Sequence, residues 1–202
     1  MNIQTVQTGC IGENCYLVNT GNKLFVIDPG ADGEVISRAI QNIEGNPGCV
    51  EILLTHSHAD HIGAVPYIAE KYNAVVRLAA ADRVIYHSPD NAFPPYIPLA
   101  VGLPETVDYT ANSDYTVIAT PGHTPGGVCL LFRHEDGSNH LFTGDTLFAG
   151  SVGRTDFELG SMPQLSASLE KLVNAVPEDT IIYPGHGETS TIGHEKKYNP
   201  YL

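Results

Sequence analysis

The chain has 202 residues, of which 42% are hydrophobic, and a formal net charge of −13. This length suits one sizeable core, so we expect a single domain over residues 1–202. The acidic balance argues against nucleic-acid and anionic membrane partners, and no apolar run reaches the 18 residues of a membrane-spanning helix. Residues 1–9 lack the basic and apolar regions of a secretory signal, so a cytoplasmic protein is expected.

In the first part of the chain, strand patterns alternate with helix patterns. Two β-favouring runs flank Gly21-Asn22 and predict a hairpin. A later apolar run predicts a buried strand, and the spacing of Ile62, Val65 and Ile68 predicts a helix after it. The expected elements are strands at 14–20, 23–28, 50–55 and 74–78, and helices at about 35–43, 62–72 and 80–86.

Residues 87–114 differ from their surroundings, because they hold five prolines and show little periodicity. Such a stretch is either part of a functional rim or a connector between two half-domains, and the sequence leaves both open. Strand and helix patterns then resume, which suggests two sheets packed face to face with helices outside. The expected elements are strands at 115–119, 128–132, 140–143 and 180–183, and helices at about 162–173 and 192–198.

Metal-ligand side chains are concentrated after the strand expected at 50–55. The run Thr-His-Ser-His-Ala-Asp-His occupies 55–61, at a tight turn from strand to helix. Three further candidates stand beside glycines at expected strand ends, where a sharp turn can place a side chain in a cleft. Imidazole and carboxylate suit zinc and similar ions, and seven ligands suit two ions with open positions for water. The candidates are His56, His58, Asp60, His61, His123, Asp145 and His186.

These motifs, taken in order, resemble those of the metallo-β-lactamase superfamily. Within that resemblance, Gly-Asp-Thr-Leu-Phe-Ala-Gly-Ser-Val-Gly-Arg-Thr-Asp-Phe at 144–157 is similar to the glyoxalase II-like hydroxyacylglutathione hydrolases, particularly their short, single-domain bacterial members. The resemblance implies an α/β fold, an αββα sandwich of two mixed β-sheets with helices on the outer faces. It covers almost the whole chain, from the strand at 14–18 to the end.

The resemblance also implies how the ligands are shared. The implied cofactors are two zinc ions, with iron or manganese as alternatives, and one carboxylate would bridge them. The implied sets are His56, His58 and His123 for the first ion, Asp60, His61 and His186 for the second, and Asp145 for the bridge.

Two cations lower the pKa of a shared water toward about 7, so a metal-bound hydroxide is the expected nucleophile. The expected reaction is hydrolysis of a thioester such as S-lactoylglutathione or a related acyl-thioester. Asp60 would orient the hydroxide and carry its proton. Arg154 stands where the resembling family has a basic residue that contacts a carboxylate of glutathione, and a local ion pair with Asp156 or Glu158 is the other interpretation.

Other functions remain open. Only sixteen residues follow His186, too few for the helical domain that completes the glutathione site of glyoxalase II enzymes, so another ester or a lactone is a further candidate. Persulfide dioxygenases resemble the chain at His-Ala-Asp-His and Gly-Arg-Thr-Asp-Phe, but typically show Gly-Asp-Ala-Leu and Pro-Ala-His-Asp. The chain has Gly-Asp-Thr-Leu and Pro-Gly-His-Gly, which favours a hydrolase. A β-lactamase and a non-catalytic metal-stabilised binding module are weaker alternatives.

Overall fold

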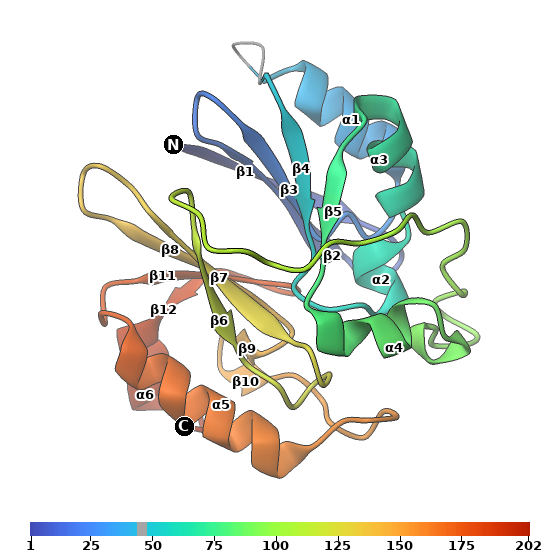
Figure 1. The fold of residues 1–202 in the computed structure, drawn as a ribbon. Helices are drawn as coiled ribbons and strands as arrows, with labels where there is room; N and C mark the ends of the chain where they lie inside the picture. The colour runs from blue at the N-terminus through green and yellow to red at the C-terminus, as the bar shows by residue number, and fades with distance from the viewer. Residues whose placement is uncertain (44–47) are drawn as a thin grey trace. The chain divides into compact units, whose positions relative to one another are not determined.

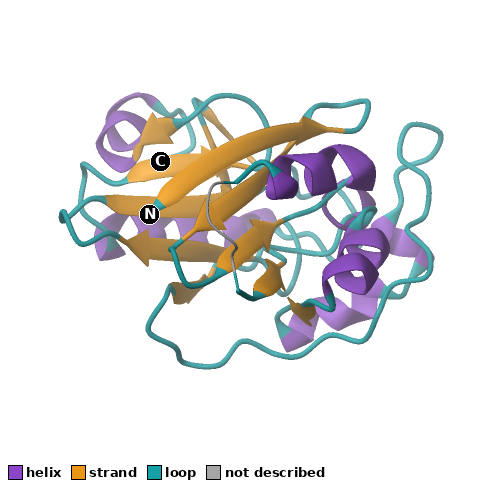
Figure 2. Cartoon of the chain, turned by 90° about the horizontal axis from the view of Figure 1, so that it is seen from above, coloured by secondary structure: helices purple, strands orange, loops and turns teal. Residues whose placement is uncertain are grey.

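The computed structural model describes residues 1–43 and 48–202. The chain divides into two compact units, Met1–Asp108 and Tyr109–Leu202, and each is described by itself. The expectation of one domain over 1–202 stays a prediction. Loops make up much of the chain (Figure 2), and no helix or strand lies between the short 3-10 helix Pro89–Asn91 and the strand Thr116–Ala119.

The first unit contains a mixed five-stranded sheet in the order β1-β2-β3-β4-β5 (Figure 1). The first three strands are antiparallel, and the next two run parallel to β3. Parallel neighbours end at the same edge of a sheet, so the turns that follow β3 and β4 lie close together. The strands are β1 (Asn2–Thr8), β2 (Glu13–Asn19), β3 (Leu24–Ile27), β4 (Val50–Leu53) and β5 (Val75–Arg77).

Helices α1 and α3 cover one face of this sheet (Figure 1). Ile36 and Ile40 of α1, with Val65 and Ile68 of α3, are buried in a single apolar core with the strands. Burial of such aliphatic side chains is the main favourable term that holds helix to sheet. The helical segments are α1 (Gly33–Gln41), α2 (Ala59–Ile62), α3 (Val65–Tyr72), the 3-10 helix Ala80–Asp82 and α4 (Arg83–Tyr86).

The helix expected at 62–72 is interrupted, which corrects the sequence-based prediction. The amide of Ala64 donates to the Pro29 carbonyl, 2.9 Å away, instead of to a carbonyl one turn back in the helix. Pro66 has no amide hydrogen and suits the first turn of a new helix, so α3 begins at Val65. The preceding turn, α2, therefore forms a separate short helix that carries Asp60 and His61.

The second unit contains another mixed five-stranded sheet, in the order β12-β11-β8-β7-β6, and the small hairpin β9-β10. Only β8 and β11 are parallel neighbours in this sheet. Leu165, Leu169 and Leu172 of α5 are buried against it. The elements are β6 (Thr116–Ala119), β7 (Val128–Arg133), β8 (Asn139–Gly144), β9 (Leu147–Phe148), β10 (Ser151–Val152), α5 (Met162–Ala175), β11 (Ile181–Pro184), β12 (Ser190–Thr191) and α6 (Ile192–Tyr198).

The four cysteines are free thiols. Cys15 and Cys129 are buried in their cores, and burial raises the pKa of the Cys129 thiol to about 11. Cys10 and Cys49 are exposed. In the part of the chain that the structure describes, no helix is long and apolar enough to cross a membrane.

Gly122 makes a close contact with the first turn of α5. Its φ is +141°, and a Cβ there would lie 2.3 Å from the Leu165 backbone nitrogen. Its carbonyl also accepts from the Ser161 amide. A side chain at this position would therefore push the turn that carries His123 away from α5.

We expect Gly122→Ala to lower the free energy of unfolding by about 2 to 5 kcal/mol, because backbone strain and steric overlap add. Gly137→Ala is the control, since Gly137 has a φ of +90° but nothing within 4 Å of a Cβ. In that control variant the free energy of unfolding should fall by only about 1 to 2 kcal/mol, because only backbone strain is added. Urea unfolding measures both, and equal losses would show that the contact with α5 is unimportant.

Candidate metal centre

The first unit gathers three imidazoles on the segment that leaves β4 and enters α2. His56, His58 and His61 are all buried. The ring of His56 lies 4.9 Å from that of His58 and 4.1 Å from that of His61, measured between centroids. On the same segment, Asp60 Oδ2 lies 3.6 Å from His61 Nε2. Four of the seven predicted ligands are therefore neighbours within this unit.

Asp28, at the end of β3, holds this segment in place. Its backbone has a φ of +51°, a conformation that aspartate tolerates better than most residues. The buried carboxylate accepts from the Thr55 amide at 2.7 Å and from the Thr55 hydroxyl at 2.6 Å. His61 Nδ1 lies 3.1 Å from the same carboxylate. Asp28 thus ties the end of β4 to α2.

These contacts fix the protonation of the histidine rings. The Thr55 hydroxyl donates to Asp28, so it can only accept from His56 Nδ1, 3.1 Å away. His61 Nδ1 faces the Asp28 carboxylate and must donate to it. In both rings the lone pair is therefore on Nε2. Metal-binding histidines usually show this pattern, with the other ring nitrogen donating to a carboxylate or carbonyl.

Asp28 also has a ligand atom within 4.8 Å of those of His56 and His61, so the three form a possible metal-binding group. The hydrogen bonds from Thr55 and His61 occupy its carboxylate oxygens. We therefore assign Asp28 to positioning the ligands.

Ser57, between His56 and His58, is anchored separately. Its hydroxyl lies within hydrogen-bond distance of the Asp82 carboxylate, at 2.9 Å, and of the Asp82 carbonyl, at 3.0 Å. Asp82 is fully buried. A buried carboxylate is costly unless it is hydrogen-bonded, so this pair restrains the turn on which both histidines stand.

Glu13 is a buried carboxylate beside the same segment. Its Oε2 accepts from the Thr8 hydroxyl at 2.7 Å, and its Oε1 lies 3.9 Å from His61 Nδ1. Burial raises the pKa of the Glu13 carboxyl well above its ordinary value, while His61 and the Thr8 hydroxyl act in the opposite direction. Gly30 packs into this corner, where a Cβ would overlap the Asp60 carbonyl.

The second unit brings the other three predicted ligands together. His123 follows β6, while Asp145 and His186 follow the parallel strands β8 and β11. The Gly185 amide donates to the Gly144 carbonyl at 2.9 Å, which sets the two turns side by side. The two oxygens of Asp145 face different imidazoles: Oδ2 lies 3.6 Å from His123 Nε2, and Oδ1 lies 3.9 Å from His186 Nε2.

These separations suit shared metal ions better than direct hydrogen bonds. Two ligands that each lie roughly 2.1 Å from one tetrahedral ion are roughly 3.4 Å apart. His123 Nδ1 also donates to the Arg154 carbonyl at 2.6 Å, which leaves the lone pair on Nε2. The nitrogen and oxygen donors of each unit therefore fit divalent transition-metal ions.

The Arg154 side chain makes a local ion pair. Its guanidinium contacts both oxygens of Asp156 at 2.7 Å and lies over the Phe157 ring, 4.1 Å from its centroid. Both charged side chains are about half exposed or more. The pair holds the pKa of the Asp156 carboxyl at about 2. The local interaction suggested by the sequence is thus present, and the main chain of Arg154 has a second task in orienting His123.

Comparison with known proteins identifies the family. The model of the Metallo-beta-lactamase superfamily matches residues 8–186. The chain belongs to this superfamily. It is 32% identical to "Hydroxyacylglutathione hydrolase GloC" of Haemophilus influenzae, with 100% of this chain and 98% of the relative covered. With its histidine and aspartate groups, the chain is a metal-dependent hydrolase of the superfamily.

Solved structures confirm the expected α/β fold class. BLEG-1, described as a B3 metallo-beta-lactamase, matches with a TM-score of 0.85 and 31% identity over 100% of this chain and 99% of its own. TTHA1623 in a di-iron-bound form matches with a TM-score of 0.86 and 36% identity, covering 98% and 100%. ETHE1 of Myxococcus xanthus matches with a TM-score of 0.73 and 28% identity, covering 99% and 84%.

Sequence reasoning missed the residues that position the ligands. Asp28 had a usable signal, because it directly follows a strand and adjoins Pro29-Gly30, and Pro-Gly pairs also adjoin the predicted ligands His123 and His186. Asp82 and Glu13 had none, since each contacts the metal-ligand segment from an element distant in sequence.

We expect Asp28→Asn to weaken binding of the metal held by the first unit by about 10- to 100-fold, because an amide replaces one acceptor with a donor. Asp32→Asn is the control, because Asp32 is exposed on the same loop and its carboxylate accepts from the Gly9 amide. Competition with a chromophoric chelator measures both. Equal metal affinity in the two variants would show that Asp28 does not position the ligands.

Proposed function

We propose that the protein hydrolyses an acyl-thioester with two divalent metal ions, zinc being the expected metal. The observation that carries the proposal is the arrangement of Asp145, whose two oxygens face two different imidazoles. A carboxylate that serves two ions in this way is a feature of two-metal hydrolytic centres. The di-iron-bound relative supports two ions and keeps iron as an alternative metal.

The proposed ligand set takes donors from both units, and the family model extends across both. We accordingly propose that residues 1–202 act as one catalytic domain. The first ion would be held by His56, His58 and His123, the second by Asp60, His61 and His186, with Asp145 between them.

Bound ions would supply Lewis acidity, which acidifies water and polarises the scissile carbonyl. Asp60 is the proposed proton carrier, because its carboxylate is partly exposed while the neighbouring imidazoles are buried. In the overall reaction water adds across the C–S bond. The acyl carbon gains the hydroxyl group, and the sulfur leaves with a proton as a free thiol.

Two rivals have specific support. ETHE1 represents the persulfide dioxygenase alternative, and its likeness to this chain extends over nearly all of it. BLEG-1 is described as a B3 metallo-beta-lactamase, which supports hydrolysis of a cyclic amide as a second alternative. We favour the thioester because the curated relative is named as a hydroxyacylglutathione hydrolase and because Thr146 and Gly187 depart from the dioxygenase pattern. We propose that the protein acts on a small molecule in the cytoplasm, and that it has no nucleic-acid or membrane partner.

The deciding assay compares three reactions with one preparation of known metal content. Free thiol is followed with S-lactoylglutathione and simpler acyl-thioesters, oxygen uptake with glutathione persulfide, and ring opening with a chromogenic cephalosporin. Thiol release without oxygen uptake is the expected result. Oxygen uptake by iron-loaded protein, with no thiol release from any thioester, would establish the dioxygenase instead.

Asp145→Ala should remove the bridge and most of the activity. We expect the variant to lose at least one of two ions per chain and to fall by about 10²-fold or more in kcat, in line with the loss of a ligand that holds both ions. Elemental analysis and the thioester assay measure the two effects. Asp136→Ala, an exposed carboxylate of the same unit, is the control and should keep both ions. A wild-type protein with only one ion per chain would refute the binuclear proposal.

Arg154→Ala tests whether this side chain binds an anionic part of the substrate. We expect KM for a glutathione thioester to rise by about tenfold with kcat nearly unchanged, because a remote charged contact is lost. The carbonyl that orients His123 is retained in the variant. Arg133→Ala, which removes an exposed arginine bonded to Thr116, is the control. An unchanged KM for every active substrate would limit Arg154 to its ion pair with Asp156.

A further inference from the structure

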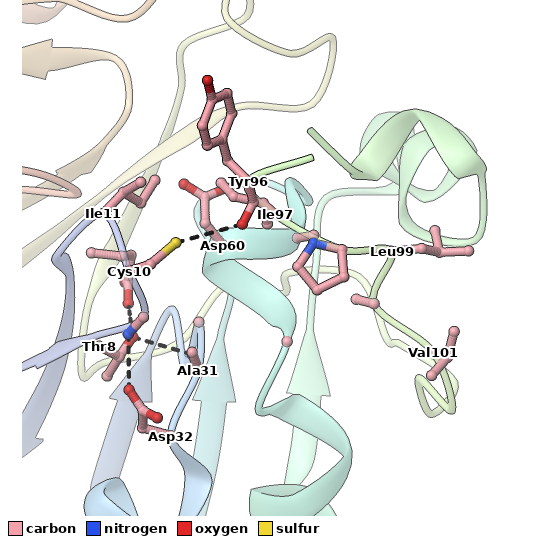
Figure 3. Close-up of a pocket in the computed structure, with 17 residues that line it drawn as sticks. Thr8, Cys10, Ile11, Ala31, Asp32, Asp60, Tyr96, Ile97, Leu99 and Val101 are labelled. Atoms are coloured by element: carbon pink, nitrogen blue, oxygen red, sulfur yellow. Dashed lines mark hydrogen bonds between the residues drawn. The ribbon is translucent and has the colours of Figure 1, made fainter. Parts of the chain in front are cut away.

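A cavity of about 350 Å³ lies in the first unit, beside Asp60. It is formed where the turn between β1 and β2 approaches the segment 96–101, with the start of α2 as a third wall. Figure 3 shows Asp60 between these two sides. The Cys10 thiol donates to the Tyr96 carbonyl at 3.5 Å, which links the turn to the segment. The proline-rich stretch thus forms part of a rim beside a predicted metal ligand.

The cavity wall is mainly apolar. Ile11, Leu99 and Val101 line it, although these side chains are 47%, 44% and 71% exposed. Exposed aliphatic side chains gathered around a hollow mark a binding surface, since an isolated protein gains nothing by holding them in water. The volume is at the lower end of the range for small-molecule pockets.

The charge of the lining restricts what can enter. Its ionisable groups include the acidic residues Glu13, Asp32 and Asp60, and no lysine, arginine or histidine lines it. A thiol such as glutathione carries carboxylates, and along this wall they would meet the Asp32 carboxylate without a basic side chain to pair with. An uncharged hydrocarbon chain meets no such repulsion, and it would bury the aliphatic side chains of the wall.

We propose that this cavity holds the acyl chain of the substrate, so that the preferred thioesters carry an unbranched aliphatic acyl group longer than lactoyl. The inference rests on the proposed thioester hydrolysis and assigns its acyl specificity to the turn at residues 9–11 and the segment 96–101. The position of Asp60 at the cavity wall places the acyl carbon near a predicted ligand while the chain extends away from it. A lactoyl group would leave most of a space equal to roughly a dozen liquid water molecules unfilled.

The first experiment uses N-acetylcysteamine thioesters with acetyl, butanoyl and hexanoyl groups, because the thiol is then neutral and constant. Each buried methylene should raise kcat/KM by about fourfold until the cavity is filled. Ile11→Asp places a carboxylate in the wall and should reduce the hexanoyl-to-acetyl ratio by at least tenfold. Val35→Asp is the matched control, since Val35 is 42% exposed on α1 and does not line the cavity.

The second experiment measures binding without catalysis. S-hexyl-N-acetylcysteamine is a thioether that cannot be hydrolysed. It should slow alkylation of Cys10 by N-ethylmaleimide at least fivefold, while the S-methyl compound should not. Cys49, the other exposed cysteine, is the internal control and should react at the same rate throughout. Peptide mass spectrometry reports both sites.

The outcomes separate the two proposals. Hydrolysis with a flat chain-length profile, or with Cys10 unprotected by the hexyl compound, overturns the acyl-site inference and leaves the thioesterase proposal intact. If no thioester is cleaved, the thioesterase proposal fails. Protection of Cys10 then decides by itself whether the cavity takes an alkyl chain.

Discussion

The conformation of residues 55–61, which carry four of the predicted metal ligands, depends on the hydrogen bonds that the Asp28 carboxylate accepts. Buried charge is costly in a protein interior, and here two hydrogen bonds from Thr55 and one from His61 compensate for it. The same bonds join the end of β3, the end of β4 and helix α2. Because Thr55 passes the interaction on to His56, one carboxylate sets the orientation of two imidazoles that are five residues apart.

The fold follows from local patterns wherever apolar residues are continuous. The buried strands β2, β3, β4 and β7 and helix α5 lie close to where hydrophobic runs or helical spacing predict them. Strand β1 was missed because Gln4, Thr5 and Gln7 give it no apolar run. The break between α2 and α3 was also missed, since it depends on a hydrogen bond from Ala64 to Pro29, which lies on another loop. Long-range backbone contacts of this kind leave no periodicity in the sequence.

In the candidate site, too, some residues can be predicted from the sequence and others cannot. Ligand types are visible in the sequence because metals require histidine and carboxylate, and the structure brings these residues together within each unit. The positioning groups are harder to find. Ser57 and Asp82 are 25 residues apart, and Thr55 and Asp28 are 27 apart, so only the folded chain reveals the pairs. The group that orients a metal ligand can be an aspartate side chain, or a main-chain carbonyl such as that of Arg154. A main-chain carbonyl has no sequence signature at all.

Asp28 and Thr55, which orient His56 and His61, do not line the cavity beside Asp60. Glu13, which lies near His61, does line it. Two walls of the cavity are a hairpin tip and an irregular loop, both of which tolerate changes in length and side chain better than sheet strands do. Substrate range can therefore diverge among descendants of such a chain, through insertions at residues 9–11 or 96–101, while the reaction chemistry is inherited unchanged. For protein engineering, those two short segments are the natural targets for randomisation.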